Sequence, residues 1–189
     1  MKKIHIYLLF GLMVVAQIFA SAQIVYKYEQ TIARGTIYKF KTAPVDPSDP
    51  FRGKYITLNF EIDRFITDDE VWNYNDKAFA YFSKDKNGYA VLETLSKTKL
   101  SDSEFDYVEV ETTNYTNKGI IYFDLPFDTY YMDENKAYDA EKLYRNNNRR
   151  NKQQDVYAIV HLQNGTHVLT DVIINGISIK NAVEKQTHL

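Results

Sequence analysis

The sequence predicts a mainly β domain of the α+β class: an antiparallel sheet or partly closed barrel with one short helix, preceded by a single N-terminal transmembrane helix. Three observations predict it. Aromatic residues make up 15% of the chain, with 16 Tyr and 11 Phe against a single Trp, and such rings suit the half-buried face of a strand. Short segments in which apolar and polar residues alternate are separated by Asn-Gly pairs, which favour tight hairpin turns. One long apolar run opens the chain.

The composition limits the domain count and the classes of function. A chain of 189 residues has room for one domain and an anchor, and we divide it into an anchor at residues 1–30 and a β-rich domain at residues 31–189. A net charge of -2 supplies no positive field for a nucleic-acid partner. Because the chain has no cysteine, disulfides, thiolate zinc sites and cysteine nucleophiles are excluded.

The N-terminal run admits two interpretations. Lys2 and Lys3 precede apolar residues from Ile4 to Tyr26. The small residues at 20–22 resemble a signal-peptidase site, which predicts a secreted protein cleaved after Ala22. Alternatively, about 20 apolar residues suffice to cross a bilayer as a retained helix. Under either interpretation the leading lysines stay in the cytoplasm and the domain lies outside.

Alternating apolar and polar residues predict the strands, at residues 36–41, 55–62, 78–83, 89–95, 107–112, 119–123, 156–162, 166–174 and 177–179. In the strand at 55–62, Ile56, Leu58 and Phe60 share the face that we expect to be buried. Helical spacing of apolar residues predicts a helix at 133–144, and the segment 63–76 is expected to be a loop or short helix.

Two polar segments have more than one interpretation. Residues 145–154 are basic and rich in Asn and Gln, and form either a solvated loop or a surface for anionic lipid or an acidic partner. Residues 43–50 contain three of the four prolines, which predicts a stiff, shaped loop. Because prolines lack backbone donors, we expect the Arg52 guanidinium to hold this loop by pairing with Asp46 or Asp49.

The sequence offers few candidate residues for metal binding or catalysis. If Asn164-Gly165 forms a two-residue turn, His161 and His167 point to opposite faces of the sheet, so we expect no histidine metal site and no cofactor. The chain contains neither a Gly-x-Ser-x-Gly elbow nor a phosphate-binding glycine loop. Carboxylates remain, around residues 46–49 and at Asp124, Asp128, Asp133 and Glu134. They could act as acid and base, or cap turns and pair with arginine.

Two blocks of sequence resemble a known family. The first runs from Ala43 to Phe60, and the second, an aromatic pair followed by acidic residues, runs from Tyr130 to Asn135. Both are similar to the GDYXXLXY domain family of bacterial membrane-anchored proteins. Gly53, Tyr55 and Leu58 stand at the namesake Gly, first Tyr and Leu of that family, whereas Lys54 replaces its Asp and Phe60 its last Tyr. A lysine at the motif aspartate argues against an obligatory catalytic acid there.

The resemblance implies that the N-terminal helix is retained in the cytoplasmic membrane with a periplasmic domain, and that a multi-spanning membrane protein is a partner. It implies no particular reaction. Because the sequence offers no complete catalytic set, we favour a non-enzymatic accessory or partner-binding module; the alternatives are an extracytoplasmic hydrolase that uses loop carboxylates and a carbohydrate- or peptidoglycan-binding domain. The candidate binding residues come from the two blocks and the proline-rich loop: Asp46, Asp49, Arg52, Gly53, Tyr55, Leu58, Tyr131 and Glu134.

Overall fold

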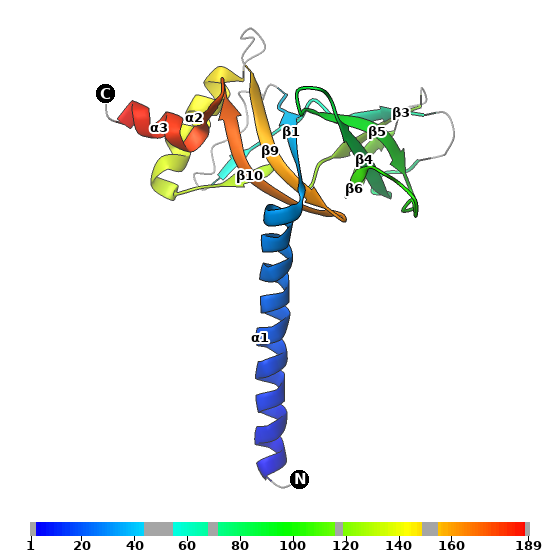
Figure 1. Ribbon diagram of the computed structural model, residues 1–189, viewed down its shortest axis with the longest axis vertical. Coiled ribbons are helices and arrows are strands. Elements are labelled where there is room, and N and C mark those ends of the chain that lie inside the picture. Colours follow the sequence, from blue (N-terminus) through cyan, green and yellow to red (C-terminus); the bar gives the residue numbers. More distant parts are fainter. Residues whose placement is uncertain (1–2, 44–54, 68–71, 116–118, 149–154, 188–189) are drawn as a thin grey trace.

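A long helix carries a β-rich domain at its C-terminal end (Figure 1). The computed structural model describes residues 3–43, 55–67, 72–115, 119–148 and 155–187. Helix α1 (Lys3–Arg34) extends away from the domain as a single rod. It is uninterrupted because its residues include no proline; Gly35 separates its last residue, Arg34, from the first strand, which begins at Thr36.

The first sheet continues directly from α1. Its strands lie in the order β1-β9-β10-β11, with bounds β1 (Thr36–Lys41), β9 (Val156–Gln163), β10 (Thr166–Ile174) and β11 (Ile177–Ser178). Asn164 and Gly165 join β9 to β10 with φ of 50° and 82°, as a tight primed turn requires. Strand β9 alternates strictly between buried and half-buried residues, so one face of this sheet forms part of the core.

The second sheet has the order β3-β7-β6-β4-β5, with bounds β3 (Arg64–Ile66), β4 (Lys77–Lys84), β5 (Ala90–Ser96), β6 (Asp106–Tyr115) and β7 (Ile120–Asp124). All its pairs are antiparallel. In the β4–β5 hairpin, Gly88 has φ of 83°, and the carboxylate of Asp85 accepts hydrogen bonds from the backbone N–H groups of Asn87 and Tyr89.

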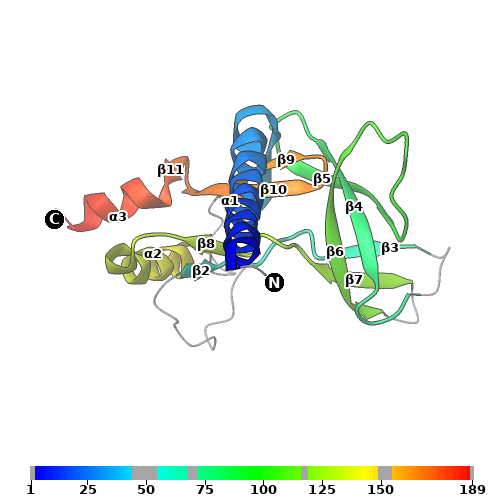
Figure 2. The ribbon, with the colours of Figure 1, turned by 90° about the horizontal axis from the view of Figure 1, so that it is seen from below.

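A short ladder and two helices complete the domain. Strand β2 (Tyr55–Thr57) pairs with β8 (Thr129–Tyr131), and helix α2 (Glu134–Asn147) follows β8. Helix α3 (Ile179–Thr187) follows β11 and joins α2 through an ion pair between Lys136 and Glu184 at 2.6 Å. Seen from below, α2 and α3 lie on one side of α1 and the second sheet lies on the other (Figure 2).

The two sheets share one aromatic core. The ring of Phe40 on β1 lies 6.0 Å from that of Phe60, 5.2 Å from that of Phe82 and 4.9 Å from that of Phe127, all edge to face. Backbone bridges link the sheets at their margins, between Lys39 and Tyr89 and between Val108 and Gly165. The result is a nearly closed antiparallel β structure, which confirms the predicted fold class.

The structure corrects four details. The strand expected at 55–62 ends at Thr57, after which Phe60 makes only a bridge to Thr42. The segment 63–76, expected to be a loop or short helix, contains strand β3. Helix α3 was not predicted and replaces the end of the strand expected at 177–179. The loop expected from residue 145 begins later, because α2 extends to Asn147; residues 149–154 lie outside the described residues.

Candidate functional site: the helix–sheet junction, the tyrosine ladder and an acidic groove

The junction between α1 and β1 is closely packed. Thr31 is only 1% exposed, and its hydroxyl donates to the carbonyl of Lys27 at 3.0 Å. The backbone N–H of Gly35 donates to the carbonyl of Thr31 at 2.9 Å. A Cβ at Gly35 would lie 2.4 Å from the carbonyl oxygen of Thr31 and 2.9 Å from that of Leu162 on β9. The last turn of α1 is therefore fixed against the first sheet, and only glycine fits where the chain turns into β1.

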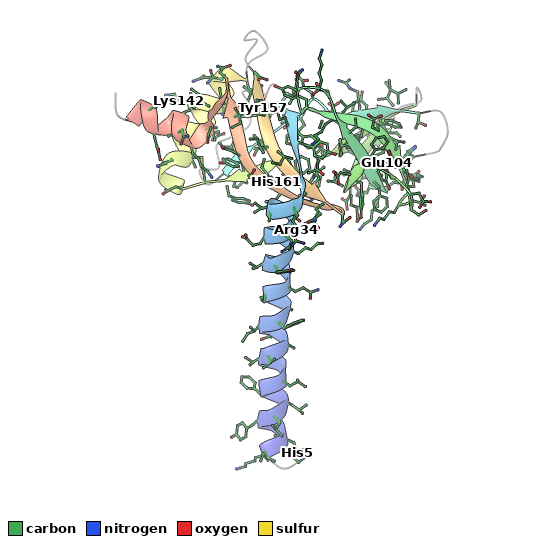
Figure 3. All side chains as sticks on the ribbon, in the orientation of Figure 1. His5, Arg34, Glu104, Lys142, Tyr157 and His161 are labelled. Carbon is green, nitrogen blue, oxygen red and sulfur yellow. The ribbon has the colours of Figure 1, made fainter. Side chains whose placement is uncertain are left out.

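The rest of α1 has no protein around it. Its large apolar side chains are exposed along the rod, among them Leu8, Phe10, Leu12, Ile18 and Phe19. Figure 3 shows the side chains of α1 projecting away from the rod, with the domain only at its C-terminal end. By length and composition this helix can cross a membrane, and it is also compatible with a signal sequence. A continuous apolar surface of this kind needs a non-aqueous environment.

The sequence-predicted site residues fall into three groups. Asp46, Asp49, Arg52 and Gly53 lie outside the described residues, so the pairing of Arg52 with a loop aspartate stays a prediction. Leu58 is a core residue, 1% exposed, and shares the buried face with Ile56 and Phe60 as expected. Tyr55 on β2 and Tyr131 on β8 are brought together, and Glu134 is the first residue of α2, which follows β8.

Strands β2 and β8 bring the two sequence blocks together. Tyr55 stands directly opposite Tyr131, and Ile56 opposite Tyr130. The rings of Tyr55 and Tyr131 have centroids 5.8 Å apart and are tilted by 59°. Tyr131 remains 72% exposed. This tyrosine ladder therefore presents an aromatic side chain to solvent beside the start of α2.

The neighbouring Tyr130 points the other way, into the domain. Its hydroxyl donates to the Asp171 carboxylate at 3.2 Å, and the Ser178 hydroxyl and Val172 N–H donate to the same oxygen at 3.0 and 2.8 Å. Burial, followed by the charge of Asp171, raises the pKa of Tyr130. The phenol therefore stays protonated and ties the tyrosine ladder to β10 and β11.

A groove lies beside the second sheet. It has a volume of about 520 Å³ and is lined by Tyr74, Asn75, Glu109, Val110, Glu111, Thr113, Asp124, Leu125, Pro126 and Asp128. Burial raises the pKa of the Asp124 carboxyl, and the charges of Asp128 and Asp63 add to the effect. The structure thus brings Asp124 and Asp128 together, as their sequence spacing suggested, whereas Asp133 is not among the described residues that line this acidic groove.

Sequence reasoning missed the other half of the acidic groove. Glu109 and Glu111 occupy alternate positions on β6 and line one wall of the groove. Tyr74, which also lines the groove, comes from the segment before β4. The alternation of the two glutamates marked them as sharing one face. Their proximity to Asp124 depends on the pairing of β6 with β7, in which Glu111 stands opposite Asp124.

The two sheet histidines are separated as expected. His161 stands opposite Val168, and His167 opposite Leu162, so the imidazoles are on opposite faces. Within the described residues no group of three potential ligands is placed to hold a metal ion. His167 instead lies beside the junction, with its ring 5.5 Å from that of Phe127. Its buried Nδ1 has no hydrogen-bond partner.

Comparison with known proteins identifies a family. The family model described as GDYXXLXY protein matches residues 17–172, from the second half of α1 to β10. No curated protein and no solved structure was found to match. The matched range covers most of the chain and includes the junction, the tyrosine ladder and the acidic groove. On this evidence the chain belongs to the GDYXXLXY family.

Proposed function

We propose that this protein is a single-pass, membrane-anchored, extracytoplasmic accessory module that binds a multi-spanning membrane protein. Residues Ile4 to Tyr26 cross the cytoplasmic membrane, with the leading lysines inside and the β domain in the periplasm. The domain has no catalytic role in this account. Its task is to hold a binding surface at a set position above the bilayer.

One observation carries the proposal: α1 and the β domain form one continuous, closely packed unit. Thr31 is buried and Gly35 touches backbone atoms of both α1 and β9. About 20 residues of α1 span the hydrocarbon core, and the turns from Lys27 to Arg34 then occupy the headgroup region. A joint of this kind fixes the orientation of the domain relative to the membrane plane. Such an arrangement suits a partner that rises from the same bilayer.

The test is in-cell photo-cross-linking of the full chain, with a photoreactive phenylalanine analogue in place of Tyr131. Ile66 on β3 is the matched control, because it is 68% exposed and lies on the second sheet. We expect a cross-link to an integral membrane protein from position 131, and none from position 66. Cross-links to glycan strands alone would favour the carbohydrate-binding alternative, and recovery of the protein in the soluble fraction would contradict the anchor.

The acidic groove supports a second candidate, an extracytoplasmic hydrolase. Asp124, whose carboxyl has a raised pKa, could hold a proton as general acid, with Asp128 beside it in the groove as the candidate base. The test compares Asp124→Asn and Asp128→Asn with the control Asp102→Asn, on a panel of ester, glycoside and peptide substrates. A hydrolysis that both groove variants abolish and the control retains would establish this candidate. Equal rates in all chains would reject it.

A further inference from the structure

A second cluster, of which Lys41 is exposed and the other members are half-buried, lies on the outer face of the first sheet. Lys39 and Lys41 project from β1 on the side opposite the buried Tyr38 and Phe40. Tyr89 precedes β5, and Tyr157 is the second residue of β9. Together these four residues form what we call the lysine–tyrosine surface. Figure 3 places Tyr157 toward the end of the domain that is farther from α1, beyond His161.

The contacts within this surface position both lysines. The ammonium of Lys39 lies 5.5 Å from the centre of the Tyr89 ring and 5.4 Å from that of Tyr157, and it donates to the carbonyl of Asn87 at 3.0 Å. The ammonium of Lys41 lies 4.8 Å from the Tyr89 ring. The two rings meet edge to face at 5.6 Å. Both cations are thus held against aromatic rings, which lowers the entropy that a ligand would have to remove.

The two carboxylates near this surface, Asp155 and Asp85, accept hydrogen bonds from the protein itself. The carboxylate of Asp155 accepts the hydroxyl of Tyr89 at 2.7 Å, and that of Asp85 accepts backbone N–H groups of the β4–β5 turn. The backbone hydrogen bond from Tyr89 is the main cause that lowers the pKa of the Asp85 carboxyl, and the charge of Lys41 lowers it further. Among the described residues, neither Lys39 nor Lys41 forms an ion pair within 4 Å. An external anion can therefore approach both ammonium groups, in competition with the Asn87 carbonyl at Lys39 and with the charge of Asp85 near Lys41.

We propose that the lysine–tyrosine surface binds an extended acidic peptide segment of the partner protein, a proposal that rests on the proposed function as a partner-binding module. Lys39 and Lys41 are alternate residues of one strand, so their Cα atoms repeat at about 7 Å. Carboxylates at alternate positions of an extended peptide have the same spacing. The Tyr89 ring is engaged by lysines, which leaves it poorly suited to stacking on a sugar. Because the surface lies at the end of the domain farther from α1, the lipid headgroups of the anchoring membrane are excluded as its ligand.

The test uses the full chain in nanodiscs of neutral lipid. Binding is followed by fluorescence anisotropy with a short labelled peptide in which Glu alternates with Ser, and with a counterpart in which Gln replaces every Glu. The variant is Lys39→Gln/Lys41→Gln. The matched control is Lys142→Gln/Lys180→Gln on α2 and α3, which removes the same charge and also takes a lysine from a tyrosine ring, because Lys180 lies 5.6 Å from the centre of the Tyr130 ring. Near-UV circular dichroism verifies that each chain is folded.

We expect the wild type to bind the Glu peptide and not the Gln peptide, and to bind less tightly as salt is raised. The Lys39→Gln/Lys41→Gln variant should lose about tenfold or more in affinity, whereas the control and Lys39→Arg/Lys41→Arg should stay close to the wild type. Equal affinity in the Gln variant, or tighter binding of a short uronic-acid oligosaccharide than of the Glu peptide, would overturn the proposal. Because the assay needs no native partner, its failure would leave the cross-linking result at Tyr131 standing.

Discussion

The ring of Tyr55 on β2 lies against the ring of Tyr131 on β8, with centroids 5.8 Å apart, because the two residues are direct cross-strand partners. Such a pair contributes about 0.2–1 kcal/mol when the side chains meet on one face. We expect a double-mutant cycle of Tyr55→Ala and Tyr131→Ala, measured by chemical denaturation, to give a coupling in this range. A coupling of zero would show that the rings do not meet in solution.

Leu58 is the motif residue that we expect to matter most for stability. Its side chain is 1% exposed and belongs to the core cluster with Ile56 and Phe60. Leu58→Ala should lower the free energy of unfolding by about 2–5 kcal/mol, through lost burial and the cavity left behind. Its exposed neighbour Thr57 provides the control, since Thr57→Ala should change stability far less. A melting temperature that is the same in both variants would mean that the buried face is misassigned.

Gly35→Ala tests the junction. The added methyl would lie 2.4 and 2.9 Å from two backbone oxygens, so the last turn of α1 or strand β9 must shift, at a cost of about 1–3 kcal/mol. Gly11→Ala is the matched control, because nothing lies within 4 Å of its Cβ position. Thermal unfolding in detergent should show a lower Tm for the Gly35 variant and no change for the Gly11 variant. Equal Tm values would indicate a loose junction.

The stability of the domain should depend on pH through His167. Burial is the main cause that lowers the pKa of its imidazole, the charge of Lys27 on α1 lowers it further, and a hydrogen bond to the Pro126 carbonyl opposes them. In the unfolded chain a histidine titrates near about 6.5. The unfolded state therefore binds a proton first as pH falls, so stability should be full above about pH 7 and decline below about 6.5.

Equilibrium unfolding between about pH 7.5 and about pH 5.5 measures this slope, across the usual histidine titration. His167→Gln cannot bind the proton, so its stability should change less over the same interval. If the wild type and the His167 variant show parallel pH profiles, the imidazole beside the junction is not the titrating group.

Much of the fold follows from local sequence, for reasons visible in particular residues. The Asn164-Gly165 pair sets the β9–β10 register, and that register alone separates His161 from His167. The alternation of apolar and polar residues predicts β1, and in the next strand it predicts that the side chain of Leu58 is on the buried face. Helix α2 was recognised from the spacing of Ala137 and Ala140, both of which are buried.

Other elements could not be predicted from local sequence, because they depend on contacts between distant parts of the chain. Strand β3 is three residues long and exists because residues 64–66 pair with β7. Helix α3 is short and polar, and packs on α2. The acidic groove depends on long-range pairing, since Glu111 meets Asp124 only through the β6–β7 ladder. The lysine–tyrosine surface likewise combines side chains from β1, from β9 and from the residue before β5, and sequence spacing predicts none of these contacts.

The central claim is that α1 stays attached and anchors the domain, and the intact mass of the chain purified from membranes tests it most directly. We predict the mass of a chain that retains residues Ile4 to Tyr26, recovered only with detergent, because those side chains are apolar and exposed along α1. A mature protein that begins at Gln23 and is recovered without detergent would contradict the account.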